Sequence, residues 1–390
     1  MSLQILHCSD THLDKNFNIS NLARAQERKE DLNRNFSFTV DYALKNKPDL
    51  FLLTGDVFDR VSPSNSSRVF ITQKIRQLKD ADIPVFIIGG NHDVPKFGVK
   101  HLAIDVLDFA GLATVFSRSD TIEKQILKIN GKTVCIAGKS FFSQFESRNP
   151  LLGCDIPLEG YYNILMIHGS LQGLNAVSSV PEMASQNPFR PGDIKAGLDY
   201  LALGHFHNYY DREHDGCKIV NPGSMERLTW AEIDDEKGFV WAELHESKVS
   251  VDFIKLETRP MRKYTINLSK DGSYAPTVKD YIIDYLQKQA DTSTVARLYL
   301  KGQITQEQSS QLNINEIFQA TGDIFFHLGL ERKELDVEGF GRVFAERLDN
   351  PIDAFVKRLD SLIAEAGDAE KGQLEQVKEL GRKYLEEARA

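Results

Sequence analysis

The stretch Leu50-Phe51-Leu52-Leu53-Thr54-Gly55-Asp56-Val57-Phe58-Asp59 joins a short apolar run directly to a turn that holds two carboxylates. A continuous apolar run of this length is typical of a strand that is buried on both faces, as in a layered α/β sheet. Gly55 then marks the start of a turn. The two carboxylates are therefore expected at the point where a buried strand ends.

Four other segments repeat this pattern. They are Leu3–Leu6 before Cys8-Ser9-Asp10-Thr11-His12, Val85–Ile88 before Gly89-Gly90-Asn91-His92-Asp93, Ile164–Ile167 before His168-Gly169-Ser170, and Tyr200–Leu203 before Gly204-His205-Phe206-His207. Segments 32–45, 69–78 and 102–109 carry apolar residues at helical spacing, which predicts an α/β fold. Shorter spacing separates the apolar runs at 134–137, 218–220 and 238–244, and we expect these runs to pair as a second sheet.

Three parts of the chain differ in their residue pattern. Residues 1–260 carry the repeated strand pattern, and residues 261–335 alternate strand-like and helix-like segments, which predicts a small separate α/β domain. Residues 345–390 are expected to form a helical tail, with Asn350 as a cap and Pro351 at the first helical position. Its apolar stripe is Ile352, Phe355, Val356, Leu359 and Ile363. Such a stripe predicts docking on a partner protein or packing against its own domain.

The charge balance limits how this chain can hold an anionic substrate. Lys and Arg number 47 and Asp and Glu number 56, so the formal net charge is -9. This balance excludes a protein that coats nucleic acid through bulk positive charge. Any anionic substrate must be held locally, by metal ions or by one basic groove.

Two further observations bear on location. We find neither an apolar run of the ~20 residues that a membrane span requires nor the features of a signal peptide. The four cysteines contain no CxxC pair, and Cys8 and Cys135 lie in apolar runs, where buried thiols are expected. The sequence therefore predicts a protein of a reducing cytoplasm, without a membrane partner.

Five of the ten histidines fall at the expected junctions of strand and loop. The candidate set is His12, His92, His168, His205 and His207, together with Asp10, Asp56, Asp59 and Asn91. Because ligands of α/β sheets bind beyond the carboxyl ends of strands, these side chains should converge. A mixture of His, Asp and Asn without Cys suits Mn, Fe or Zn. So many ligands exceed the needs of one ion and predict two ions that share a carboxylate.

Together the five motifs resemble those of the calcineurin-like metallophosphoesterases. The matching residues are Asp10-x-His12, Gly55-Asp56-x-x-Asp59-Arg60, Gly90-Asn91-His92-Asp93, His168 and Gly204-His205-x-His207. The resemblance implies that one metal ion is bound by Asp10, His12, Asp56 and His207, and the other by Asp56, Asn91, His168 and His205. It also implies an α/β fold with a two-sheet β-sandwich flanked by helices, so we expect the buried strands in two packed sheets.

The remaining motif residues have expected roles in phosphoester hydrolysis. Two cations would lower the pKa of a bridging water, and the resulting hydroxide would attack phosphorus. His92 is the expected general acid for the leaving oxygen, and Asp59 is the expected partner that fixes its tautomer and raises its pKa. Arg60 is a candidate phosphate contact, with a surface ion pair to an acidic neighbour as an equal alternative.

Two further stretches, Leu198–His207 and Asn221–Arg227, are similar to segments of the SbcD-type nuclease subunit of DNA double-strand-break repair complexes. The order of phosphoesterase domain, α/β capping domain and helical tail is similar as well. The resemblance implies DNA as substrate, an SbcC-type coiled-coil ATPase docked on the tail, and a homodimer formed through the helices at 69–78 and 102–109. Many of those nucleases have His where this chain has Asp59.

The leading prediction is therefore a DNA phosphodiesterase with two divalent metal ions, most consistent with Mn. It would act as an exonuclease or single-strand endonuclease in an ATP-driven repair complex, cytoplasmic and nucleoid-associated in a prokaryote. The same five motifs serve many phosphoesterases, so a small-molecule or nucleotide phosphodiesterase or phosphatase is an alternative. A non-catalytic scaffold that recruits an ATPase is a third.

Overall fold

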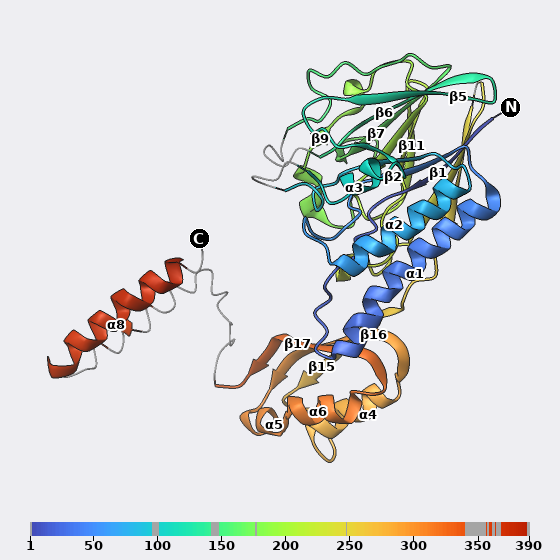
Figure 1. The fold of residues 1–390 in the computed structure, drawn as a ribbon. Helices are drawn as coiled ribbons and strands as arrows, with labels where there is room; N and C mark the ends of the chain where they lie inside the picture. Colours follow the sequence, from blue (N-terminus) through green and yellow to red (C-terminus); the bar gives the residue numbers. More distant parts are fainter. Residues whose placement is uncertain are drawn as a thin grey trace. The chain divides into compact units, whose positions relative to one another are not determined.

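Figure 1 shows the fold in a computed structural model, which describes residues 2–95, 101–141, 148–175, 178–246, 248–339, 356, 359–360, 363 and 368–387. The chain divides into two compact units, Met1–Met261 and Arg262–Ala390. The first unit contains two six-stranded sheets and the second a three-stranded sheet, and helices accompany both, so the predicted α/β class is confirmed. Within the described ranges, none of the helices combines the length and apolarity that a membrane span needs.

The first sheet has the strand order β14-β13-β1-β2-β3-β4. Its strands are β1 (Leu3–Cys8), β2 (Leu50–Thr54), β3 (Val85–Ile88), β4 (Thr114–Phe116), β13 (Gly238–Leu244) and β14 (Val249–Lys255). β1, β2, β3 and β4 are parallel, whereas β13 is antiparallel to both of its neighbours. The parallel strands therefore all end at one edge of the sheet.

The second sheet has the order β11-β12-β10-β7-β6-β5. Its strands are β5 (Glu123–Ile129), β6 (Lys132–Lys139), β7 (Tyr162–His168), β10 (Tyr200–Gly204), β11 (Tyr210–His214) and β12 (Cys217–Asn221). The four central strands are parallel, and the two edge strands are antiparallel to them. A short additional pair, β8 (Ser170–Leu171) with β9 (Pro188–Phe189), follows β7 in the chain.

One predicted strand pairing is wrong. We expected Gly238–Leu244 to join the segments at 134–137 and 218–220, but as β13 it pairs with β1 in the first sheet, from Leu3 opposite Leu244 to His7 opposite Val240. This register points Val240 and Leu244 into the same core as Leu3. β13 thus extends the first sheet beyond β1, a long-range pairing that spacing along the chain does not reveal.

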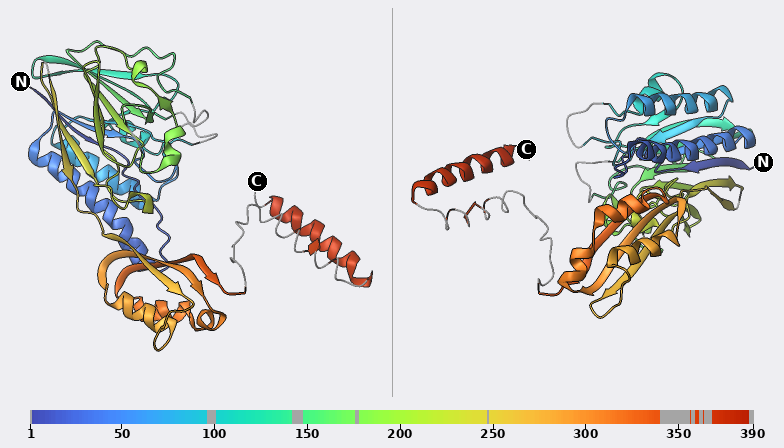
Figure 2. Two further views of the ribbon diagram at one scale, coloured as in Figure 1. Left: turned by 180° about the vertical axis from the view of Figure 1, so that it is seen from behind. Right: turned by 90° about the horizontal axis from the view of Figure 1, so that it is seen from below.

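Three helices cover the outer face of the first sheet, and Figure 2 shows the two long ones side by side. They are α1 (Leu22–Asn46), α2 (Asn65–Asp80) and α3 (Asp105–Phe109). The rings of Phe36 on α1 and Phe70 on α2 meet edge to face at 6.2 Å. α1 begins well before the predicted apolar stripe, because the Asn21 side chain accepts a hydrogen bond from the Arg24 N–H and caps the helix.

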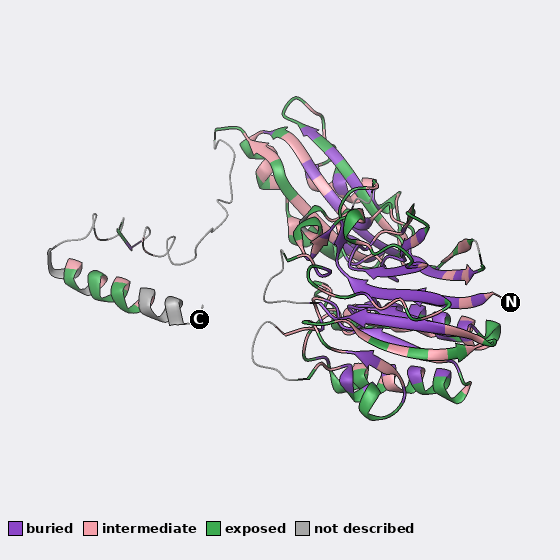
Figure 3. Ribbon diagram, turned by 90° about the horizontal axis from the view of Figure 1, so that it is seen from above, coloured by how far each residue is buried: buried purple, intermediate pink, exposed green. Residues whose placement is uncertain are grey.

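Between the two sheets lies a second core, visible in Figure 3 as buried strands. Ile5 and Leu52 of the first sheet and Ile164 and Ala202 of the second are at most 1% exposed there. β2, β3, β7 and β10 are buried along their whole length, as their continuous apolar runs predict. This rigid sandwich holds the loops that follow these strands.

The second unit has its own core. Its sheet has the order β15-β16-β17, formed by β15 (Met261–Ser269), β16 (Asp291–Ile304) and β17 (Phe325–Val337). The helices are α4 (Val278–Gln287), α5 (Gln306–Gln311), α6 (Ile314–Thr321) and α8 (Asp368–Glu387). Ile282 of α4 and Ile317 of α6 are fully buried against the sheet. The predicted cap Asn350 with Pro351, Ile352 and Phe355 lies outside the described residues.

Candidate metal centre

The loops after β1, β2, β3, β7 and β10 meet at one edge of the sandwich. The Asp10 N–H donates to the Gly55 carbonyl at 3.1 Å, and the His12 N–H donates to the Asp56 carbonyl at 2.9 Å. The second sheet joins them, because the His205 N–H donates to the Asp10 carboxylate at 3.0 Å. The structure therefore brings both sheets' polar junctions into one cluster.

Backbone geometry in this cluster is unusual. Asp10, His12, Asp56 and His205 have φ values of 49°, 42°, 48° and 99°, in the left-handed region that non-glycine residues rarely adopt. Such conformations persist only where surrounding structure enforces them, and they concentrate at functional sites. Gly204 allows the close approach of the two sheets, since a Cβ there would lie 2.1 Å from the Thr54 carbonyl oxygen.

The first ligand group consists of Asp10, His12 and His207, whose ligand atoms lie within 4.8 Å of one another. The Nδ1 atom of His12 faces the Asp59 carboxylate at 3.0 Å, and Nδ1 of His207 faces the Glu232 carboxylate at 3.1 Å. Both Nδ1 atoms are thereby fixed as donors. Both Nε2 atoms are buried and have no hydrogen-bond partner among the described residues. Their lone pairs are free to bind a cation.

The second ligand group is built from His168, His205 and Asn91. Nδ1 of His168 donates to the Thr54 carbonyl at 2.9 Å, and Nε2 of His205 donates to the Met183 carbonyl at 3.0 Å. The remaining ring nitrogen of each histidine lies 3.0 Å from Oδ1 of Asn91. When both imidazoles are neutral, as metal ligands must be, that second nitrogen offers only a lone pair, and three acceptors then face one another.

Asp56 lies between the two groups. Its Oδ2 is 3.4 Å from Nε2 of His12 and 3.6 Å from Nε2 of His168, and it forms a further ligand group with Asp10 and His168. Burial would lower the pKa of His168, but the Asp56 carboxylate raises it to about 9. The buried carboxylates thus favour positive charge at this point. A carboxylate that is shared by two cations needs such an environment.

His92 lies beside the cluster. Its ring meets that of His12 edge to face, with 4.7 Å between the ring centroids. The backbone N–H of His92 donates to Oδ1 of Asp56 at 2.9 Å. Burial would lower the pKa of His92, but the Asp56 charge and the hydrogen bond to the Asp59 carbonyl raise it. His92 is only partly buried, so its ring remains accessible at the edge of the site.

The predicted contact between Asp59 and His92 is made by a different atom. Nδ1 of His92 donates to the backbone carbonyl of Asp59 at 2.9 Å, whereas the Asp59 carboxylate contacts His12 and, at 2.9 Å, Nζ of Lys15. The carboxylate turns toward His12 because its two hydrogen-bond donors lie there. Arg60 is 46% exposed, and its Nε lies 3.8 Å from the Asp14 carboxylate. This is the geometry of the surface ion pair, the alternative to a phosphate contact in the sequence analysis.

Two residues of the site were not among the predicted site residues, although Asp93 belongs to the Gly90-Asn91-His92-Asp93 motif. Glu232 lies in the short 3-10 helix Trp230–Glu232 and is fully buried, with its carboxylate 2.8 Å from Nζ of the fully buried Lys237. Burial would raise the pKa of Glu232, but His207 and Lys237 hold it well below its usual range. Asp93 accepts hydrogen bonds from the N–H groups of Val57, Phe58 and Gly90 and so ties two ligand loops together.

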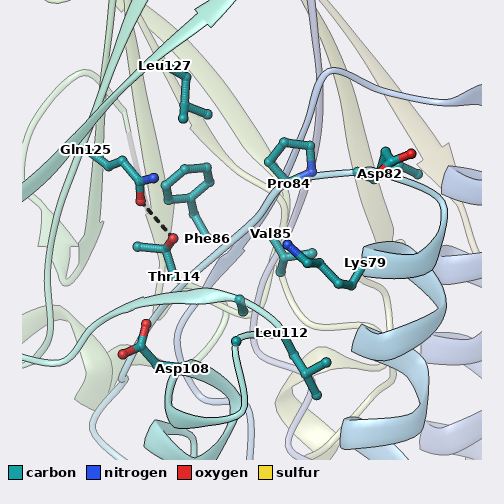
Figure 4. A pocket seen from close by; sticks show the side chains of 13 residues that line it. Lys79, Asp82, Pro84, Val85, Phe86, Asp108, Leu112, Thr114, Gln125 and Leu127 are labelled. Carbon is teal, nitrogen blue, oxygen red and sulfur yellow. Dashed lines mark hydrogen bonds between the residues drawn. The ribbon is translucent and has the colours of Figure 1, made fainter.

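A separate hollow of about 430 Å³ lies elsewhere on the sandwich (Figure 4). It is lined by residues near the start of β3 and β4, including Val85 and Thr114, and by Gln125 and Leu127 of β5. Asn91 follows the opposite end of β3, so this hollow does not include the ligand cluster. Nothing in its lining supplies a group of metal ligands among the described residues.

Comparisons with known proteins agree with this geometry. The family model for calcineurin-like phosphoesterases matches residues 3–209, which contain every candidate ligand. A protein named DNA double-strand break repair protein Mre11 from Saccharolobus solfataricus is 26% identical over 314 residues, 77% of this chain and 76% of that protein. Its namesake from Sulfurisphaera tokodaii is 30% identical over 272 residues, 68% of this chain and 65% of that protein.

A third relative carries a less specific name. The uncharacterized metallophosphoesterase YhaO of Bacillus subtilis is 26% identical over 257 residues, 64% of this chain and 60% of that protein. Proteins matched by this family model bind two divalent metal ions, and the two groups of converging acceptors fit that number. The orphaned ring nitrogens of His12 and His207 fit a cation better than they fit an empty apolar cavity.

Proposed function

We propose that this chain, which belongs to the calcineurin-like phosphoesterase family, is a manganese-dependent DNA phosphodiesterase of a repair complex. The observation that carries the proposal is the pair of ligand groups that meet at Asp56. Asp10, His12, Asp56 and His207 would hold one ion, and Asp56, Asn91, His168 and His205 the other. Nitrogen and oxygen donors without sulfur suit Mn, and Fe or Zn are the other candidates.

The chain's own residues have distinct roles in this proposal. When bound, two divalent cations supply Lewis-acid polarisation of the phosphate and an acidified water. Asp59 and Glu232 orient His12 and His207 through their Nδ1 atoms. His92, held at Nδ1 by the Asp59 carbonyl, donates a proton from Nε2 to the leaving oxygen. Asp59 thus acts on His92 through its backbone and on His12 through its side chain.

DNA is the proposed substrate because two relatives at 26–30% identity over most of the chain are named for double-strand break repair. The net charge of -9 means that the scissile phosphate is held by the metal centre rather than by bulk attraction. Arg60, exposed near this edge, is the proposed additional phosphate contact.

Partner contacts are proposed on two surfaces. α2 and α3 expose Val69, Val106 and Phe109 to 54%, 49% and 73%, and these apolar side chains are the proposed homodimer contacts. Residues 345–390 form the proposed docking segment for an SbcC-type coiled-coil ATPase, where α8 exposes Val377 and Leu380 to 52% and 55%. Residues 1–260 would then be the nuclease domain and 261–335 the cap of a cytoplasmic, nucleoid-associated protein.

The test compares three substrates with the purified full chain and Mn. An end-labelled oligonucleotide and bis-p-nitrophenyl phosphate should be hydrolysed, and p-nitrophenyl phosphate should be hydrolysed slowly. Rapid hydrolysis of the monoester with an intact oligonucleotide would replace the nuclease with a small-molecule phosphatase. No hydrolysis of any substrate would favour a scaffold. Arg60→Ala, outside both ligand groups, serves as the control for metal content.

A further inference from the structure

His7 is a fully buried histidine that belongs to neither ligand group. Along β1 it follows Leu3 and Ile5 on the face that packs against the second sheet. Where those two residues make apolar contacts, His7 makes hydrogen bonds to β10. Its Nδ1 lies 3.0 Å from the Tyr200 hydroxyl, and its Nε2 lies 3.1 Å from the Leu203 carbonyl. His7 therefore links the two sheets through the core between them.

The hydrogen bonds of His7 have one consistent direction. Burial lowers the pKa of His7 to about 3, although the hydrogen bond to the Leu203 carbonyl opposes that shift, so the ring is neutral at pH 7. Because a carbonyl only accepts, Nε2 carries the proton, and the Tyr200 hydroxyl donates to Nδ1. Nε2 also lies 2.9 Å from Oγ1 of Thr54 on β2, which itself donates to the Leu203 carbonyl at 2.8 Å. Each of these polar groups has a partner, and a fully paired buried network rigidifies a core.

This cross-sheet bridge lies directly behind the candidate metal centre. Thr54 precedes Asp56 by two residues, and its carbonyl accepts the hydrogen bond from Nδ1 of His168 at 2.9 Å. Leu203 precedes His205 by two residues. The bridge thus joins the two sheets at the strand ends from which the ligand loops start.

Both ligand groups combine side chains from the two sheets. In the first group, Asp10 and His12 follow β1, whereas His207 follows β10. In the second, Asp56 follows β2, whereas His168 is the last residue of β7. The separation of ligands within each group therefore depends on the offset between the sheets. Apolar packing is non-directional and tolerates small offsets, whereas hydrogen bonds favour one distance and one angle.

We propose that His7 is a positioning residue of the metal centre. Its hydrogen bonds to Tyr200 and Leu203 fix the offset between the two sheets, and this offset sets the spacing of the two ions around Asp56. The inference rests on the proposed two-metal function and deepens it. His7 acts through the backbone of Leu203 and through Thr54, not by contact with an ion or with substrate.

The test compares the full chain with the double variant His7→Leu with Tyr200→Phe. Removing both polar partners leaves neither of them unpaired in the core, so the metal-free double variant should unfold in urea near the parent midpoint. Its second Mn ion should bind about tenfold more weakly. The low-temperature electron paramagnetic resonance signal of the magnetically coupled Mn pair should change or disappear. His7→Gln, which offers a donor to Leu203 and an acceptor to Tyr200, should restore both the affinity and the signal.

Asn163→Ala is the matched control for a loss of buried hydrogen bonds. Asn163 lies near the start of β7, and its Nδ2 donates to the Gly160 and Gly197 carbonyls at 3.2 and 3.4 Å, at the end of the strand remote from His168. This variant should lose stability but keep the parent's Mn affinity and coupled signal.

Three outcomes would count against the proposal. Parent-like Mn affinity and coupled signal in the folded double variant would overturn the role of His7 and leave the two-metal centre standing. If the double variant does not fold, Tyr200→Phe alone decides, because it removes one cross-sheet bond through a single hydroxyl, and an unchanged signal there would overturn the proposal. A parent chain that binds fewer than two Mn ions would overturn the proposed function, and with it the spacing assigned to His7.

Discussion

Replacing Glu232 with glutamine isolates what one buried carboxylate does for His207. The parent carboxylate faces Nδ1 of His207 at 3.1 Å and Nζ of Lys237 at 2.8 Å, all within a fully buried cluster. Glutamine keeps the volume and removes the charge. Among the residues that the structure describes, Lys237 then retains only Asp235, at 3.4 Å, as an anionic partner.

Two effects of different size follow. Loss of a buried counter-ion costs about 3 kcal/mol of unfolding free energy, because Lys237 is left poorly compensated. Loss of the carboxylate that orients a metal-binding histidine lowers metal affinity by about 10- to 100-fold, or roughly 1.4–2.7 kcal/mol of binding free energy. Only the first effect is relieved when the lysine is removed as well.

The assay therefore combines urea unfolding without metal with titration of Mn by calorimetry, for the parent, Glu232→Gln and Glu232→Gln with Lys237→Met. The double variant should recover most of the stability but not the Mn affinity. Parent-like Mn affinity in Glu232→Gln would refute the claim that Glu232 positions His207. Glu236→Gln, on an exposed pair with Lys255, is the matched control and should change neither quantity.

Three other perturbations test separate parts of the structure. His92→Ala should retain Mn and lose turnover by about 100-fold or more, whereas His168→Ala should lose Mn, and equal metal loss in both would contradict their different roles. Gly204→Ala should destabilise the chain by at least about 2 kcal/mol in thermal unfolding, because its Cβ would overlap the Thr54 carbonyl oxygen; a parent-like melting curve would contradict this. Burial would raise the pKa of Asp31, but Arg259 and Arg28 lower it, so Asp31→Asn should cost about 3 kcal/mol at pH 7. That difference should shrink as pH falls below about 4, where the parent carboxylate becomes protonated, and a constant difference down to pH 2 would exclude the ion pair.

Much of the site was predictable because each candidate ligand directly follows an apolar run. Asp56 after Leu50–Thr54 and His205 after Tyr200–Gly204 are placed by local sequence. Parallel pairing aligns the strand ends within each sheet, and the packing of the two sheets brings the two residues together. Glu232 was not predictable, since it follows no strand and reaches His207 only through tertiary packing. For the same reason the sequence could not show that the Asp59 carboxylate contacts His12 rather than His92.

Some features of the fold also escape local pattern. From residue 240 to 244, β13 alternates buried and half-exposed residues, a pattern that predicts a strand but not the sheet that it joins. α1 extends to Leu22 although its first turns lack an apolar stripe, because helix formation continues from the packed portion to the Asn21 cap. In both cases the deciding interaction is non-local or lies outside the periodic segment.

The most direct measurement is the number of Mn ions bound per chain, determined by elemental analysis after equilibrium dialysis of the parent and of Asp56→Ala. Two ions per chain are expected for the parent, because two ligand groups meet at Asp56. The Asp56→Ala variant should bind fewer than one Mn ion per chain tightly. One ion or none in the parent, or two retained in Asp56→Ala, would contradict a two-metal centre built around this carboxylate.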